Sequence, residues 1–234
     1  MHKLLIFGWV GAGLVLGFLC WFVFSRRRAT RKRTLIEASP PGGPEALIEA
    51  ARSGGTAIRP LLEQGANPNV QNAKGKTPLM WAAHHGQAEA VTALLDAGAI
   101  VDLIDKDGLS ALMYAAWRDG CTSALERLLE RGADPNLQDT VGQTALMKAA
   151  WFGLTATAAA LVKAGADVNM REAGGATALI WASKWGHRDC VQVLLSASAD
   201  ITVRDREGKT ALMHANEQKR CPVAKMLKDA GAAE

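Results

Sequence analysis

The feature that most constrains this 234-residue chain is a motif that recurs at a nearly constant interval. A Gly is followed two residues later by Thr or Ser and four residues later by Leu, and the spacings between copies are 33, 34, 33 and 33 residues. The five copies begin at Gly75, Gly108, Gly142, Gly175 and Gly208. Self-similarity at this interval predicts a repeat protein, in which each unit buries its apolar face against its neighbours.

The start of each unit has the pattern of a short amphipathic helix. The Thr or Ser of the motif suits an N-cap, and Pro78 suits a first helical position because no N–H is needed there. Leu79, Ala82 and Ala83 then fall on one face at i, i+3 and i+4. Because Ala is small, we expect this helix to stack closely against its equivalents in neighbouring units.

The rest of each unit predicts a turn, a second helix and a polar hairpin. A Gly such as Gly86 turns the chain, and the second helix carries a Leu pair such as Leu94 and Leu95. Another Gly, at positions 98, 132 and 165, ends the helix where a positive φ is favoured. The hairpins contain Asn69, Asn136 and Asn169, whose side chains we expect to bond to local backbone. The predicted fold class is an all-α solenoid of helix–turn–helix–hairpin units.

This unit resembles the ankyrin repeat, which opens with Thr-Pro-Leu-x-x-Ala-Ala in a unit of about 33 residues. The resemblance covers residues 44–234 and implies six repeats. The first, Pro44 to Lys74, lacks the Thr-x-Leu opening, and the last, Gly208 to Glu234, has polar residues at positions that are apolar elsewhere. Both match caps, which need a polar outer face. The third repeat has one extra residue near Gly120, and Ser198 replaces a Gly of the fifth at a modest expected cost.

By resemblance, a protein partner is expected on the concave side, at positions nine and ten residues after each repeat Gly. The predicted partner-binding residues are His84, His85, Trp117, Arg118, Trp151, Phe152, Lys184 and Trp185. Trp beside Arg or Lys is favourable there because these types dominate interface energies. The alternative is that Trp117, Trp151 and Trp185 close the stack, as we expect of Trp81 and Trp181, which lie six residues after the Gly.

The residues before the repeats have the composition of a membrane span. Residues Leu4 to Phe24 carry no charge, and a helix of this length spans roughly 30 Å, the thickness of a hydrocarbon core. The run is too long for a signal peptide, and no small-x-small cleavage site follows it. We therefore expect residues 1–25 to be a transmembrane helix. Gly13 and Gly17 form a GxxxG that permits helix packing in the bilayer, although Gly is also simply frequent in such helices.

A basic segment and linker, residues 26–43, follow the apolar run. Its cations are Arg26, Arg27, Arg28, Arg31, Lys32 and Arg33. Basic flanks stay inside, so we expect the N-terminus outside and the repeats facing the cytoplasm or a matrix-like compartment. The segment is expected to contact lipid headgroups, and Thr30 follows a basic pair typical of kinase sites.

The same segment explains the sequence pI of about 9.0. Seven of the 27 basic residues precede Thr34, so the remainder has 20 basic against 23 acidic residues, a net charge of −3. A nucleic-acid-binding domain would distribute basic charge over its own face, which argues against a nucleic-acid partner.

No recognised catalytic or metal-binding motif is present in the sequence, and no cofactor or metal is expected. Lys148 occupies the position of Trp81 and is expected to leave a charge near the groove. His187 and Cys190, at i and i+3, resemble a reactive pair, but nothing in the sequence orients the His. We expect a membrane-anchored adaptor that holds an unidentified protein. The alternative is a constitutive subunit of a larger membrane complex.

Overall fold

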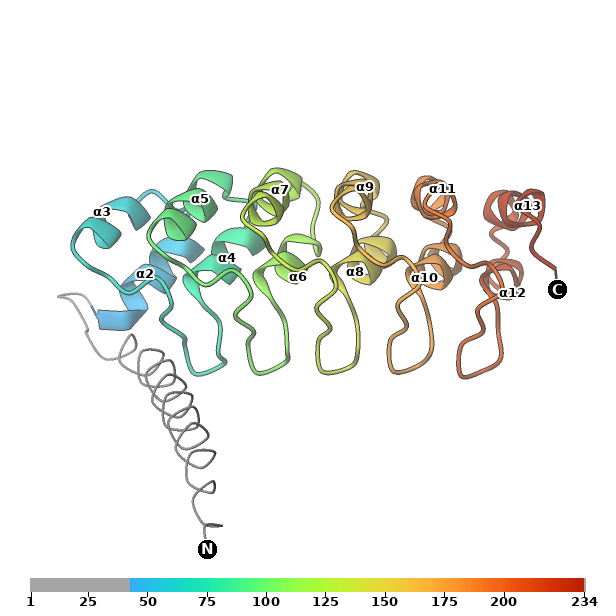
Figure 1. Ribbon diagram of the computed structural model, residues 1–234, viewed down its shortest axis with the longest axis horizontal. Coiled ribbons are helices and arrows are strands. Elements are labelled where there is room, and N and C mark those ends of the chain that lie inside the picture. Colours follow the sequence, from blue (N-terminus) through green and yellow to red (C-terminus); the bar gives the residue numbers. More distant parts are fainter. Residues whose placement is uncertain (1–42, 234) are drawn as a thin grey trace, which may run out of the picture. The chain divides into compact units, whose positions relative to one another are not determined.

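The computed structural model describes residues 43–233, which form twelve helices arranged as six consecutive pairs (Figure 1). The first helices of the pairs are α2 (Gly43–Arg52), α4 (Pro78–His84), α6 (Ala111–Ala115), α8 (Ala145–Phe152), α10 (Ala178–Trp185) and α12 (Ala211–Glu217). The second helices are α3 (Ile58–Glu63), α5 (Ala88–Asp96), α7 (Thr122–Glu130), α9 (Thr155–Lys163), α11 (Arg188–Ser196) and α13 (Cys221–Asp229).

The first helices form one layer and the second helices form the other, and the hairpins extend beyond the first-helix layer (Figure 1). Within the described residues, the only β-type pairing is an isolated bridge between Ile104 and Ser110. The predicted all-α solenoid is therefore confirmed. The predicted span, residues 1–25, and all of segment 26–43 except Gly43 lie outside the described residues. Between Gly43 and Ala233, no helix has the length and apolarity needed to cross a bilayer.

Side-chain caps begin the first helices of repeats two to six. Each capping hydroxyl accepts a hydrogen bond from the backbone N–H three residues later, at 3.2–3.4 Å. The caps are Thr77, Ser110, Thr144, Thr177 and Thr210. Such a cap typically contributes about 1 kcal/mol, so the recurring hydroxyl determines where each first helix begins.

Small residues line the contact between the two layers and between repeats. Ala82 and Ala83 of α4 are fully buried, as are the equivalent Ala149 and Ala150 of α8. In the second helices the first Leu of each predicted pair is fully buried, as at Leu94, whereas its neighbour is only partly buried. The core is thus one continuous stripe of small and branched side chains along the stack.

The hairpin Asn side chains join neighbouring repeats, and the expectation of local bonds was wrong. Asn69 accepts a hydrogen bond from the N–H of Ile100 at 2.7 Å and donates one to the carbonyl of Gly98 at 3.1 Å. Asn136 and Asn169 accept equivalent bonds from the next repeat. The amide thus reaches from one hairpin to the residues that follow the second helix of the next repeat.

Two positions show how closely successive turns approach. Gly86 has φ of +66°, and a Cβ there would lie 2.8 Å from the carbonyl oxygen of Gly120 in the next repeat. Only Gly satisfies both conditions without a shift of the backbone. Ser198 adopts φ of +62° where the other repeats have Gly, which is the strained conformation predicted for that position.

Candidate protein-binding groove

The candidate site is the surface formed by the first helices at positions six, nine and ten after each repeat Gly. These positions share one face of a helix because they are spaced by three and four residues. We call this surface the groove. In the described residues it has two differently built halves, one on α4 and α6 and one on α8 and α10.

The half on α4 and α6 contains a pocket of about 260 Å³. Its lining residues are Lys76, Met80, Trp81, His84, Tyr114, Trp117 and Arg118. The Lys76 ammonium lies 5.2 Å from the ring centroid of Trp81 and 4.7 Å from that of Tyr114. Two aromatic faces therefore hold a cation at the wall of the pocket.

The half on α8 and α10 carries an aromatic cluster of Trp151, Trp181 and Trp185, and Phe152 follows Trp151 in α8. The ring centroid of Trp151 lies 4.2 Å from that of Trp181 and 5.7 Å from that of Trp185. Phe152 is 45% exposed and Trp185 is 42% exposed. This is apolar surface that the described part of the chain leaves uncovered.

The predicted partner-binding residues divide between these halves. His84, His85, Trp117 and Arg118 lie on the pocket side, and Trp151, Phe152, Lys184 and Trp185 lie on the cluster side. Among them, Trp117 is partly buried and packs against the core. Trp81 and Trp181 also pack against the core, as expected.

The two adjacent His rings on the pocket side sit in a positive environment. Burial lowers the pKa of His84 below 6.5, and the charges of His85, Arg118 and Lys76 lower it further. Burial, Arg118 and Arg52 likewise lower the pKa of His85. The charged groups that act on these rings are all basic.

Lys148 brings a positive charge next to the groove, as expected, since its Nζ lies 5.3 Å from the ring centroid of Trp117, but that charge is paired. Lys148 is 6% exposed, and its Nζ lies 2.8 Å from Asp139 Oδ2 and 3.0 Å from Gln143 Oε1. The hairpin folds back along the first helix, so an acid three residues before the repeat Gly meets a side chain six residues after it. The positive charge of Lys148 is thus neutralised by the hairpin that precedes its helix.

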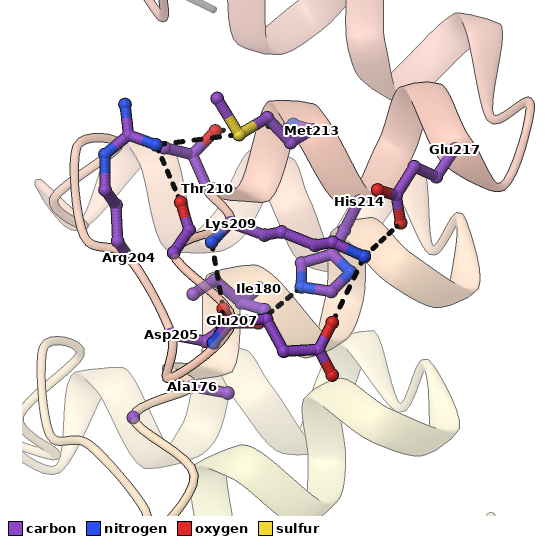
Figure 2. A network of polar contacts seen from close by, with 12 residues as sticks. Ala176, Ile180, Arg204, Asp205, Glu207, Lys209, Thr210, Met213, His214 and Glu217 are labelled. Atoms are coloured by element: carbon purple, nitrogen blue, oxygen red, sulfur yellow. Dashed lines mark hydrogen bonds and ion pairs between the residues drawn. The ribbon is translucent and has the colours of Figure 1, made fainter.

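The same tether occurs in two other repeats with different chemistry. The Tyr114 hydroxyl donates to Asp105 at 2.6 Å, and His214 Nε2 lies 2.6 Å from Asp205 Oδ2. Figure 2 shows the latter pair beside the Lys209 ammonium, which contacts Glu207 and Glu217. In each case the other carboxylate oxygen accepts two hairpin N–H bonds. The sequence analysis did not predict these hairpin-to-helix contacts, although each is marked in the sequence by an Asp nine residues before Tyr, Lys or His.

Of the five repeats that begin with the Gly motif, the two without the tether carry Trp at the helix position. The side-chain oxygen of Asn72 accepts bonds from two hairpin N–H groups. Each of the two carboxylate oxygens of Glu172 accepts one such bond. The facing indole nitrogens, Trp81 Nε1 and Trp181 Nε1, have no hydrogen-bond partner within residues 43–233. Instead, Lys76 and Lys184 lie over these rings. The hairpin residue therefore decides whether a repeat presents a tethered polar group or a Trp to the groove.

The sequence pair His187 and Cys190 does not form a reactive dyad. His187 Nε2 lies 3.0 Å from the carbonyl oxygen of Trp151, and the Cys190 thiol lies 3.4 Å from Thr155 Oγ1. Burial raises the pKa of Cys190, which keeps it a thiol. Within the described part of the chain, no cluster of side chains could hold a metal ion.

The stacked helix pairs and their groove define a class of protein, the helical-repeat solenoids that bind other proteins. Within that class, this chain belongs to the ankyrin-repeat family. The family model for ankyrin repeats (3 copies) matches residues 47–139, 118–205 and 146–233. The described part is therefore a protein–protein interaction module.

Known proteins share short stretches of this module. An ankyrin repeat domain-containing protein from Stachybotrys chartarum is 43% identical over 83 residues, which is 35% of this chain and 4% of that protein. An E3 ubiquitin-protein ligase from Arabidopsis thaliana is 38% identical over 95 residues, covering 40% and 6%. A putative ankyrin repeat-containing protein from Treponema pallidum is 45% identical over 71 residues, covering 30% and 24%. The matches thus span at most about a quarter of these relatives.

The tether predicts how the fourth repeat responds to substitution. Asp139→Asn leaves the Lys148 ammonium buried without its carboxylate, a change that typically costs about 3–5 kcal/mol. Asp139→Asn combined with Lys148→Met should recover most of that loss, because Asn72 shows that an amide alone satisfies the hairpin. Urea unfolding of the single and double variants measures both effects. Equal destabilisation by the two variants would contradict the tether.

The last repeat predicts a pH effect. Burial raises the pKa of Asp205, but hydrogen bonds from His214 and from the hairpin N–H of Lys209 outweigh it, so the pKa lies below 3.8. A lowered carboxylate pKa contributes stability above the unfolded pKa of about 3.9, which is lost as pH falls through the folded pKa. Asp205→Asn should therefore lower the unfolding free energy at pH 5 by more than at pH 3. Asp229→Asn, which removes an exposed carboxylate from the same repeat, is the control.

Proposed function

We propose that this chain is a membrane-anchored module that holds a partner protein near a membrane surface through its groove. The observation that carries the proposal is the aromatic cluster on α8 and α10. Phe152 and Trp185 are nearly half exposed, and Trp151 packs beside Trp185. Aromatic surface of this kind costs solubility unless a partner covers it, and aromatic residues supply much of the binding energy at interfaces.

The sequence before the repeats supports the membrane part of the proposal. The apolar run lies within residues 1–25, and the six cations of residues 26–33 follow it. These features suit a span with its basic flank inside, and the cations suit contact with anionic headgroups. The stretch from Thr34 to Gly43 has ten residues and reaches at most roughly 35 Å, so the partner would bind close to the bilayer.

An alternative function is a constitutive accessory subunit of a larger membrane complex. The GxxxG of Gly13 and Gly17 favours it, since small residues four apart allow another helix to approach closely. Native gel electrophoresis in mild detergent separates the two functions. A stable large species of fixed stoichiometry supports the subunit, and a mostly free chain supports the adaptor.

The groove assignment predicts the effect of removing exposed aromatic surface. Phe152→Ser combined with Trp185→Ser should weaken partner capture at least tenfold, because hot-spot aromatics each contribute about 2 kcal/mol or more. Both side chains are nearly half exposed and neither belongs to the buried core, so the stability of the stack should change little. Quantitative affinity capture with mass spectrometry measures the loss.

The matched control for this experiment is Ile100→Ser, which removes a side chain of similar exposure, 44%, outside the groove positions. It should leave capture intact. If both variants retain the same partners in the same amounts, the groove does not hold the partner.

The anchor predicts a defined topology. In sealed inside-out vesicles, added protease should digest the repeats, because the basic flank keeps them on the cytoplasmic side. A chain lacking residues 1–25 should leave the membrane fraction in high salt, since the basic segment alone binds lipid only electrostatically. Full protection of the repeats in such vesicles would reverse the topology. Membrane retention without residues 1–25 would remove the need for a span.

A further inference from the structure

We infer that the pocket on α4 and α6 binds an acidic peptide segment of the partner, with an apolar side chain in the pocket and a carboxylate between Lys76 and Arg118. This inference rests on the proposed function, because it assigns a chemical class to the ligand of the same groove. Three observations carry it: the unpaired cations, the positive environment of the His pair, and the apolar floor of the pocket.

The first observation is which cations of the groove lack a carboxylate. Ion pairs neutralise Arg52 with Glu49, Lys148 with Asp139, and Lys209 with Glu207 and Glu217. Among the described residues, no carboxylate lies within ion-pair distance of Lys76, Arg118 or Lys184. The unpaired charge of the groove is therefore positive, although the chain beyond Arg33 carries a net charge of −3.

Two carboxylates of the hairpin before α6, Asp105 and Asp107, act on Tyr114 at the pocket wall. Asp105 accepts bonds from the Tyr114 hydroxyl and from the N–H groups of Asp107 and Leu109. Asp107 is exposed in the hairpin. Neither pairs with Lys76 or Arg118, so a carboxylate from a ligand would supply the missing partner.

The second observation concerns the two imidazoles beside the pocket. After burial, the groups that lower the pKa of His84 are His85, Arg118 and Lys76, and those acting on His85 are Arg118 and Arg52. Cations thus dominate the potential at the rim. A bound carboxylate would lower this potential and favour protonation of both rings.

The third observation is the apolar character of the pocket floor. Met80, Trp81, Tyr114 and Trp117 provide much of its lining. An apolar cavity of about 150 Å³ accommodates benzene, so a pocket of about 260 Å³ has room for an aromatic or branched side chain. The Lys76 ammonium is already held over two rings at this wall, so little side-chain entropy would be lost when it pairs with a ligand.

Charge also discriminates among occupants. The segment of residues 26–33 has six positive charges and no acid, so the unpaired cations would repel it. A nucleic acid would use a longer track of cations, commonly six to ten phosphate contacts, whereas the groove offers three. An acidic peptide with an apolar side chain needs only a few cations beside an apolar cavity. The pocket presents both of these.

The experiment selects random twelve-residue peptides displayed on phage against the full-length chain in a non-ionic detergent. We expect the selected peptides to be rich in Asp and Glu next to Leu, Phe or Trp. Lys76→Gln combined with Arg118→Gln should weaken the affinity for a selected synthetic peptide roughly tenfold, since its ion pairs with both cations are lost. Binding should also weaken between 50 and 300 mM salt.

Two control variants isolate the charge effect. Lys163→Gln combined with Lys225→Gln removes the same charge from exposed positions on the second-helix layer and should leave affinity within about twofold. Arg118→Lys keeps the positive charge and should retain most of the affinity. Circular dichroism and urea unfolding confirm that each variant is folded.

The outcomes separate this inference from the proposed function. Selection of neutral or basic peptides would overturn the inference. If those peptides also lose binding to the Phe152→Ser/Trp185→Ser variant, the proposed function remains supported. Acidic peptides whose affinity is unchanged by Lys76→Gln combined with Arg118→Gln would overturn the inference as well. Tighter binding of a single-stranded twenty-nucleotide DNA through these cations would replace the peptide with a nucleic acid. If no ligand depends on any groove residue, both the inference and the proposed function fail.

Discussion

The close approach of the first helices is the constraint on which the rest of the structure depends. It exists because Ala82, Ala83 and their equivalents leave no bulk between successive helices. A larger side chain there would separate the hairpins, which also bond directly from one repeat to the next, as from Lys106 N–H to the Lys74 carbonyl at 3.1 Å. The groove follows from this stacking, because the first helices bring the residues at positions six and nine after each repeat Gly side by side, as with His84 and Trp117 or Trp151 and Trp181.

The hairpin gives each repeat control over what it presents to that face. An Asp in the hairpin has one oxygen left over after its turn is satisfied, and it holds Tyr114, Lys148 or His214. Asn72 and Glu172 have none to spare, and Trp takes the facing position. A single hairpin residue therefore sets what the following helix presents to the groove without disturbing the core, which allows one scaffold to carry different grooves.

Local rules made most of the fold predictable from sequence. The capping hydroxyls, the buried Ala pair and the positive φ of Gly98 depend on a few neighbouring residues, so their spacing was sufficient. The interactions that were missed connect distant residues. Asn69 bonds to a residue 31 positions away, and the burial of Lys148 depends on the hairpin folding back over its helix. Position alone placed eight residues in the groove, but it could not show that Trp117 packs against the core while Trp185 remains exposed.

The two halves of the groove make different physical contributions to recognition. Burial of aromatic surface on α8 and α10 contributes affinity but little directional preference, because hydrophobic contact is non-directional. The unpaired cations Lys76 and Arg118 beside α4 and α6 contribute orientation, since a carboxylate in the wrong place gains nothing and a cation is repelled. Lys148 of α8 adds no free charge to the aromatic half, because Asp139 neutralises it. The acidic peptide inferred above would therefore place its carboxylates over the second and third repeats and its apolar part over the fourth and fifth, which would select one direction of the bound chain over the reverse.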